Sequence, residues 1–557
     1  MNFFKIKSLL LFSSISLLVV SSSFIFISTV HDLQFTNSEY FKDQALSYRI
    51  KSNKLKASRG NIYDTNLNVV ASSSRSFNIG IFPKQISNVD EVAASIGIIL
   101  NIDQEKIIEK IISSDRFFYL KRNIEFKAGE EIKSWNLDGV VLEPSYMRHV
   151  HSESLKKIIG IVDPDENGIE GIEYYFNSNL EGTDGEIKYE ASPNGKMIPQ
   201  AEVKTIQPIH GKDLILTIDS DLQYLSESLC EDALIRTEAL NCSIVFSYAN
   251  SGEILIAAEK QSENIQSYDI DLISLRAIYE PGSSLKIFSI GAGIENGLID
   301  ENTKFVVNDF IEVIEGSCSI NYEGYKACYK DFLNHEPYEL SVMEIIERSS
   351  NVGTILATQD LNINYLEEYL MKFGFGKPTG IELTGELSGG FRDNKTCATC
   401  LSSLSIGYSI NVTQLQMIKA YSIIANGGKN VNLSMVKKEN ISLSSEQIIS
   451  YESANRLKKL LINVVDGENG TGRSLQLQNY IIGGKTGTSK THIEGVGYSD
   501  FRYNTSFTGF IETSKGPVVG SVVLWGASVN PRSEYVTGGS TAAPIFKNIV
   551  SNLVPGE

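Results

Sequence analysis

Histidine is scarce in this chain, whose 557 residues include only six. They are His31, His149, His151, His210, His335 and His492. No two of them have the His-Glu-x-x-His spacing of a zinc protease, and a Gly-x-Ser-x-Gly elbow for a Ser-His-Asp hydrolase is absent. The sequence argues against both enzyme classes, and we expect neither a catalytic metal nor a cofactor.

Positive charge is also in short supply. The chain has 50 Lys and Arg against 67 Asp and Glu, a formal net charge of −17. Nucleic-acid binding needs clustered basic side chains, so nucleic acid is not expected as a partner. A hydrophobic content of 42% and a charged content of 21% are typical of folded proteins, and a chain of 557 residues predicts two folded domains.

One stretch near the N-terminus has no charged residue. Residues 8–30 follow Lys5 and Lys7 and, at ~1.5 Å per residue, are long enough to cross a ~30 Å hydrocarbon core. The positive flank predicts a cytoplasmic tail over residues 1–7, with the rest exported. A cleaved signal peptide is the alternative, but the span is long and lacks an Ala-x-Ala site, which favours an uncleaved anchor.

After a linker over residues 31–56, residues 57–205 present no nucleophile, metal cluster or phosphate loop. Residues 61–71 have the pattern of a strand, a turn and a strand, and residues 89–100 and 105–113 have helical spacing of apolar residues. We expect this segment to be a pedestal that lifts a catalytic domain off the membrane.

The second domain is expected over residues 206–557. Residues 214–219, 242–248 and 253–258 have strand patterns, and Asp219 or Ser220 is placed to cap a helix over 221–239. Three more strands over 480–488, 505–510 and 518–525 precede a final helix over 542–553. This order predicts an α+β domain in which a sheet is flanked by helices.

Ser283 is the candidate catalytic nucleophile. Pro281 and Gly282 mark a loop, and the apolar run that follows predicts a helix beginning at or just before Ser283. Lys286 lies one turn further along the same face, within reach of the Ser283 hydroxyl. A lysine activates serine only when neutral, and burial or a neighbouring positive charge lowers its pKa. The same spacing at Ser154 and Ser434 is interpreted as surface sequence.

Order strengthens this reading. Ser283-x-x-Lys286 is followed by Ser349-Ser350-Asn351 and then by Lys485-Thr486-Gly487-Thr488. Such an ordered trio is typical of class A β-lactamases and penicillin-binding proteins. Ser-x-Asn alone also occurs from Ser192, Ser319 and Ser409, so the order rather than any single motif carries the prediction.

With Tyr279-Glu280-Pro281-Gly282 before Ser283, the chain resembles class B penicillin-binding proteins, the monofunctional D,D-transpeptidases of peptidoglycan synthesis. The stretch from Arg59 to Asp64 resembles that family's Arg-Gly-x-Ile-x-Asp box, and residues 120–122 and 171–173 resemble further boxes of its non-catalytic domain. The resemblance runs from about residue 57 to the end. It implies a dimerisation-type pedestal and a β-lactamase-like transpeptidase domain with an antiparallel sheet.

The resemblance and the residues together imply a serine acyl-enzyme. Ser283 is expected to attack the D-Ala-D-Ala bond of a stem peptide after Lys286 takes its proton, with Ser349 and Lys485 relaying a proton to the leaving amine. Asn351 would orient the substrate. The N–H groups of Ser283 and Thr488 would hold the oxyanion, and Thr486, Gly487 and Thr488 the substrate carboxylate. A β-lactam should acylate Ser283.

The chain resembles the division-specific FtsI-type branch in three respects. These are its length, the lack of appended C-terminal modules and the compact sequence over residues 168–182. Either branch implies a single-pass protein of the bacterial inner membrane with a periplasmic or extracellular catalytic domain. It also implies a polytopic glycan polymerase of the shape, elongation, division and sporulation family and divisome membrane proteins as partners. The alternatives are a D,D-carboxypeptidase or β-lactamase-type hydrolase, an elongation-specific transpeptidase and a non-enzymatic β-lactam receptor.

Two features depart from the family pattern. Where the family often has Gly-His-Gly or Gly-Gln-Gly, this chain has Ile406-Gly407-Tyr408-Ser409. Residues 261–275 also lack the proline-rich sequence that is usual in the family. Six cysteines also lie in the exported domain, namely Cys230, Cys242, Cys318, Cys328, Cys397 and Cys400. A local disulfide at 318/328, at 397/400 or at both, buried thiols, and a zinc site all remain open, because sequence does not give connectivity.

Overall fold

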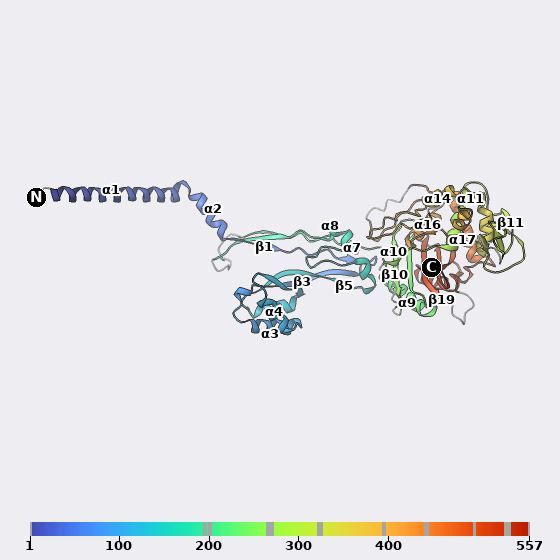
Figure 1. The fold of residues 1–557 in the computed structure, drawn as a ribbon, viewed down its shortest axis with the longest axis horizontal. Coiled ribbons are helices and arrows are strands. Elements are labelled where there is room, and N and C mark those ends of the chain that lie inside the picture. The colour runs from blue at the N-terminus through green and yellow to red at the C-terminus, as the bar shows by residue number, and fades with distance from the viewer. Residues whose placement is uncertain are drawn as a thin grey trace.

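The computed structural model describes residues 3–192, 198, 203–262, 272–319, 327–392, 397–438, 445–493, 497–528 and 536–554. The chain is elongated: a single long helix leads into a narrow pedestal, which leads into a globular catalytic domain that contains the C-terminus (Figure 1). This arrangement agrees with the predicted order of anchor, pedestal and catalytic domain.

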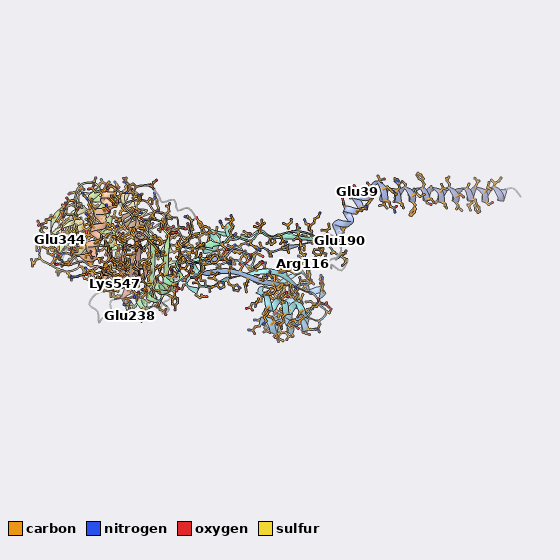
Figure 2. The ribbon with its side chains drawn as sticks, turned by 180° about the vertical axis from the view of Figure 1, so that it is seen from behind. Glu39, Arg116, Glu190, Glu238, Glu344 and Lys547 are labelled. Atoms are coloured by element: carbon orange, nitrogen blue, oxygen red, sulfur yellow. A yellow bond between two sulfur atoms is a disulfide. The ribbon has the colours of Figure 1, made fainter. Side chains whose placement is uncertain are left out.

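The large apolar side chains of the first helix, α1 (Phe3–His31), are exposed from Ile6 to Ile27. Its side chains project outward on all sides (Figure 2), and the apolar helical stretch over 6–36 is long enough to cross a membrane. Its hydroxyl groups bond to carbonyls within the helix, as in Ser21 to Leu18 (3.0 Å) and Thr29 to Ile25 (2.8 Å). These internal bonds make serine and threonine tolerable in an apolar span. The helix is suited to anchor the chain in a membrane.

The pedestal is built on long antiparallel strands. Strand β3 (Val69–Ile81) pairs with β5 (Val140–Val150) over its length and with β4 (Phe118–Glu125) over its second half. Helices α3 (Val89–Leu100), α4 (Gln104–Ile112) and α5 (Phe126–Ser134) pack on this sheet around one apolar core. The predicted helices and strand pair of this segment are confirmed.

Two charged residues of the pedestal boxes, Arg59 and Glu173, meet in the interior. Glu173 receives hydrogen bonds from Arg59 (2.5 Å) and Arg148 (2.6 Å), and all three side chains are at most 4% exposed. Arg148 also donates to the carbonyl of Gly60 (2.8 Å). The box resemblance therefore marks a buried ion-pair network that ties separate pedestal segments together.

Pedestal pairing continues past residue 205. Strands β1 (Ile50–Leu55), β6 (Gly185–Glu190) and β7 (Lys204–Ile206) form an antiparallel sheet, and β8 (Leu214–Ile215) lies parallel to β2 (Ile62–Tyr63). The strand predicted over 214–219 was too long, because Leu216 bridges instead to Val436 of the catalytic domain.

The catalytic domain has a five-stranded antiparallel sheet in the order β10-β9-β19-β18-β17. The strands are β9 (Asn241–Tyr248), β10 (Ile254–Gln261), β17 (Ile482–Ile493), β18 (Gly497–Ile511) and β19 (Val518–Ser528). Every residue of the central β19 is buried, since helices cover both faces. Helices α9 (Ser220–Thr237) and α18 (Ala542–Leu553) lie on one face, and α11 (Lys286–Glu295), α16 (Gln414–Ala425) and α17 (Tyr451–Asp466) on the other. The predicted α+β class is confirmed.

Shorter elements complete the fold. In the anchor and pedestal these are α2 (Ser38–Arg49), α6 (Lys156–Ile159), α7 (Gly171–Tyr175) and α8 (Asn177–Leu180). In the catalytic domain they are α10 (Ile273–Arg276), β11 (Lys304–Val307), β12 (Phe310–Glu312), β13 (Cys328–Lys330), β14 (Tyr338–Ser341), α12 (Val342–Arg348), α13 (Asn351–Thr358), α14 (Ile363–Lys372), β15 (Gly390–Phe391), α15 (Cys400–Ser405) and β16 (Ile410–Asn411).

All six cysteines are paired. The two local disulfides, Cys318–Cys328 and Cys397–Cys400, were among the predicted alternatives, whereas Cys230–Cys242, which joins α9 to β9, was not predicted as a pair. Because no thiol is free, the zinc and buried-thiol alternatives are wrong. Among the described residues, no cluster of His, Cys, Asp and Glu is suited to hold a metal ion.

Candidate active site

Ser283 lies in a 3₁₀ turn (Gly282–Leu285) that leads directly into α11. The predicted helix start is therefore present, with a tighter first turn. Ser283 remains partly exposed, whereas Ser284, Leu285 and Lys286 are buried. The buried apolar residues of α11 hold this turn in place, and the Ser283 hydroxyl remains accessible.

Lys286, the first residue of α11, is completely buried. Its Nζ donates to the Ser349 carbonyl oxygen (2.7 Å) and lies 3.4 Å from the Ser349 hydroxyl. Burial lowers the pKa of Lys286 to about 7, while the negative charge of Asp331 acts in the opposite direction. At neutral pH a large fraction of this amine is uncharged, as a proton acceptor must be.

Lys286 and Ser283 both belong to the described part of the chain, and the expected hydrogen bond between their side chains is not formed there. Catalytic hydrogen bonds are often long in unliganded enzymes and tighten when substrate binds. Contact between these two side chains therefore stays a prediction, although they share one turn.

The second motif forms the sharp junction between α12 and α13. Ser349 has a left-handed backbone (φ 62°, ψ 37°), which is uncommon for a residue with a side chain. This conformation turns the chain and presents the Ser349 carbonyl to Lys286. Ser350 then caps α13 by accepting from the Gly353 N–H (2.8 Å), and Asn351 donates its side-chain amide to the Lys330 carbonyl (2.7 Å).

The third motif lies on β17, beside the turn that carries Ser283. Lys485 is completely buried, and burial together with the nearby charge of Lys286 holds its pKa well below the usual value. A Cβ added at Gly487 would lie 2.5 Å from the Ser284 hydroxyl, and Ser489 donates to the Glu280 carbonyl (2.9 Å). The three motifs, far apart in sequence, therefore converge around Ser283.

The two threonines of this motif have separate partners. Thr486 donates to the Thr471 hydroxyl (2.9 Å), and the Thr488 hydroxyl accepts from the Gly538 N–H (3.2 Å). Thr488 remains partly exposed, and its carbonyl would lie 3.1 Å from a Cβ added at Gly282. Thr488 of β17 therefore lies next to the turn that carries Ser283.

The stretch that departs from the family pattern packs on the same turn. Gly407 (φ 86°) accepts from the Gly282 N–H (3.1 Å), and a Cβ at Gly407 would lie 1.9 Å from the Gly282 carbonyl oxygen. Ser409 follows with φ 64° and donates its N–H to Glu280 (3.2 Å). Only the glycine of this stretch is needed for the close approach.

Sequence reasoning missed two carboxylates at this site. Glu280, whose pKa is raised by burial, also accepts from Tyr498 of β18 (2.9 Å), and so holds that strand against the Ser283 turn. Asp331 accepts from the backbone of the second motif. Its position next to the first motif is a sequence signal that could have identified Glu280. Nothing in the local sequence singles out Asp331.

Comparison with known proteins agrees with this geometry. The family description "Penicillin binding protein transpeptidase domain" matches residues 242–551 and "Penicillin-binding Protein dimerisation domain" matches residues 54–216. The chain belongs to the penicillin-binding transpeptidase family. It is an enzyme of the peptidoglycan D,D-transpeptidase class with the two-domain fold of class B penicillin-binding proteins.

Individual relatives are distant but match most of the chain. Stage V sporulation protein D of Bacillus subtilis is 27% identical over 522 residues, which cover 89% of this chain and 78% of the relative. Peptidoglycan D,D-transpeptidase FtsI of Buchnera aphidicola is 28% identical over 487 residues, covering 84% of this chain and 81% of the relative.

Solved structures share the fold. Penicillin Binding Protein 2X from Streptococcus thermophilus has a TM-score of 0.66 at 22% identity, with 90% of this chain and 80% of that chain covered. A peptidoglycan synthetase from Bifidobacterium adolescentis has a TM-score of 0.67 at 23% identity, covering 91% and 96%.

Proposed function

We propose that this transpeptidase crosslinks peptidoglycan stem peptides through an acyl-enzyme on Ser283. In the first step, Lys286 takes the hydroxyl proton while Ser283 Oγ bonds to the carbonyl carbon of the D-Ala-D-Ala link. The carbon–nitrogen bond then breaks, and the leaving D-alanine amine receives a proton relayed through Ser349 and Lys485. An amine of a second stem peptide reverses these steps and carries the acyl group away.

The observation that carries this proposal is the pair of completely buried amines beside Ser283. The charge of Lys286 acts on the pKa of Lys485, so a shared proton between them costs less than two charges. A Cβ added at Gly282 would lie 3.1 Å from the Thr488 carbonyl oxygen, so Thr488 lies near the turn that carries Ser283, which supports a shared oxyanion site. Asn351 would orient the substrate backbone, and Thr486, Gly487 and Thr488 would receive its carboxylate beside Lys485.

Labelling with a fluorescent penicillin tests the nucleophile. We expect wild type to form a stable adduct on the peptide that contains Ser283, and Ser283→Ala to form none. Ser154→Ala is a matched control, because Ser154 begins another Ser-x-x-Lys in this chain and bonds to Glu227 and Gln223 of α9, far from Ser283 in sequence. Labelling that persists in Ser283→Ala, or rapid release of hydrolysed antibiotic as in a β-lactamase, would contradict the proposal.

Transfer to an amine separates the transpeptidase from a D,D-carboxypeptidase. Wild type given a donor peptide and an amine acceptor should release D-alanine and form the acyl–amine product. A receptor without enzymatic activity would release no D-alanine, and a carboxypeptidase would release it without forming that product.

We further propose a division role at the inner membrane. One matched relative is named FtsI, and 84% of this chain is covered by that match. The anchor helix would leave residues 1–7 in the cytoplasm and place the pedestal (57–205) and transpeptidase domain (206–557) outside. A fluorescent fusion expressed in its own host should concentrate at the septum, and uniform side-wall fluorescence would instead favour an elongation role.

A polytopic glycan polymerase of the shape, elongation, division and sporulation family is the partner we propose for α1 and the pedestal, alongside divisome membrane proteins. The support is the bare surface of α1, whose apolar side chains have no partner within the described chain. Photocrosslinkers at exposed positions such as Leu17 should capture this polymerase, whereas a crosslinker at Ile235 of the catalytic domain should not.

A further inference from the structure

A carboxylate that follows the β12–β13 hairpin lies against the second motif. The Asp331 side chain is 8% exposed. Its Oδ1 accepts the N–H groups of Asn351 (2.6 Å) and Val352 (3.0 Å), and its Oδ2 accepts the Ser350 hydroxyl (2.7 Å). Three donors from the first turn of α13 therefore converge on one negative charge, which the helix N-terminus also favours.

The same motif is held from its other side by Lys286. Nζ of Lys286 bonds to the Ser349 carbonyl, one residue before the group that Asp331 fixes. Asp331 and Lys286 therefore hold opposite ends of one short turn. Because Ser349 has a left-handed backbone, that turn needs contacts on both sides to keep its shape.

Asp331 is itself held in place by the hairpin. Its N–H donates to the Asp309 carbonyl (2.9 Å), and His335 Nε2 lies 3.3 Å from its Oδ2. The Cys318–Cys328 disulfide closes the segment before β13, and the hydroxyl of Tyr329 on β13 lies 2.6 Å from that of Ser403 on α15. The carboxylate thus reaches the active site from a braced element rather than from a free loop.

We propose that Asp331 is a positioning residue of the acyl-transfer site, whose carboxylate fixes the Ser349–Asn351 turn and so the place of the Lys286 amine beside Ser283. The inference rests on the proposed roles of Ser283 and Lys286. Asp331 contacts neither substrate nor nucleophile and acts through the second motif.

Asp331→Asn is the informative change. An asparagine has one acceptor oxygen where Asp331 has two, so its NH₂ group would face either the Ser350 hydroxyl or the two backbone N–H groups, and the turn loses part of its support. Small displacements of catalytic groups are costly, and we expect the second-order rate constant for acylation by a fluorescent penicillin to fall on the order of 10²-fold. Asp309→Asn is the matched control: it removes a carboxylate from the same hairpin without touching the turn, and should acylate like wild type.

The pH profile distinguishes positioning from general loosening. The charged groups that face Lys286 are Lys485 from β17 and Asp331 from the hairpin, and Asp331 itself faces His335. Loss of the Asp331 charge favours the neutral amine, so the acidic limb of the acylation profile should move to lower pH in Asp331→Asn. His335→Gln keeps the carboxylate and should leave that limb nearly in place.

Two results would overturn the inference: wild-type acylation in Asp331→Asn, or an equal loss in Asp309→Asn with no shift of the acidic limb. Should Asp331→Asn fail to fold, Ser350→Ala removes one of the three hydrogen bonds and must also slow acylation for the inference to stand. These outcomes are separate from the proposed function, since labelling that survives Ser283→Ala would refute the nucleophile whatever Asp331 does.

Discussion

The Nζ atom of Lys286 lies 2.7 Å from the carbonyl oxygen of Ser349, 63 positions further along the chain. A backbone carbonyl accepts a hydrogen bond from either protonation state of the amine, so it can hold Lys286 in place through a catalytic cycle. Since burial removes the water shell of the ammonium form, a large fraction of the amine is neutral near neutral pH. The hydrogen bond to Ser349 thus fixes the position of the Lys286 amine, and burial lowers its pKa so that it can act as a base.

Acylation should follow the titration of Lys286. With a pKa of about 7, the rate of β-lactam acylation should rise with pH through that value and level off above it, because only the neutral amine takes the Ser283 proton. Stopped-flow labelling between pH 5.5 and 8.5 measures this. A rate that stays constant across the range would show that Lys286 is not the base.

Stability should also respond to this lysine. Its folded pKa of about 7 lies below the unfolded value of about 10.4, so between these values the unfolded chain holds a proton that the folded chain does not. Folding stability therefore rises with pH through that window, and below it the burial cost of the charge is present in full. From pH 7 to 9 the contribution is about 2 to 3 kcal/mol.

The test compares wild type with Lys286→Met, which has similar volume and no charge. The difference in free energy of unfolding, Met variant minus wild type, should be largest at or below pH 7 and shrink toward pH 9. Urea denaturation at fixed ionic strength gives both values. Parallel pH dependences in the two proteins would mean that the folded Lys286 titrates near its ordinary pKa.

The sequence was most informative where spacing is local. Helices α3 and α18 were predicted to the residue, because their apolar residues recur with one clear period. Ser283, Lys286, Ser349 and Lys485 were identified through an ordered set of motifs, and the structure brings them together.

Long-range contacts were the part that sequence could not give. Asp331 reaches the second motif only because a disulfide-closed hairpin is inserted between the first two motifs, and Cys230 meets Cys242 only because α9 packs on β9. The left-handed backbone of Ser349 was equally hidden, since serine has no preference for that conformation. Each of these depends on tertiary packing rather than on neighbouring residues.

Pedestal stability should depend on Glu173. Replacing it by Gln leaves the guanidinium groups of Arg59 and Arg148 buried without a negative partner, which should cost about 3 to 5 kcal/mol of pedestal stability. Hydrogen exchange followed by mass spectrometry should show faster exchange in pedestal peptides and unchanged exchange in β9 and β19. Glu339→Gln is the control, because its pair with Lys304 is more than half exposed and should contribute little to stability. Equal effects of the two variants would refute a structural role for the network.

The close approach of Gly407 to the Ser283 turn should be specific to glycine. In Gly407→Ala the added Cβ would lie 1.9 Å from the Gly282 carbonyl oxygen, so the turn carrying Ser283 must shift and acylation should fall by roughly 10²-fold.

Gly380→Ala is a matched control: its φ of 81° is close to the 86° of Gly407, but a Cβ there meets nothing within 4 Å among the described residues. Both variants should lose about 1 to 2 kcal/mol from the left-handed backbone, measured by urea denaturation. Only Gly407→Ala should label slowly with fluorescent penicillin. Equal labelling of the two would show that the 406–409 stretch does not shape the position of Ser283.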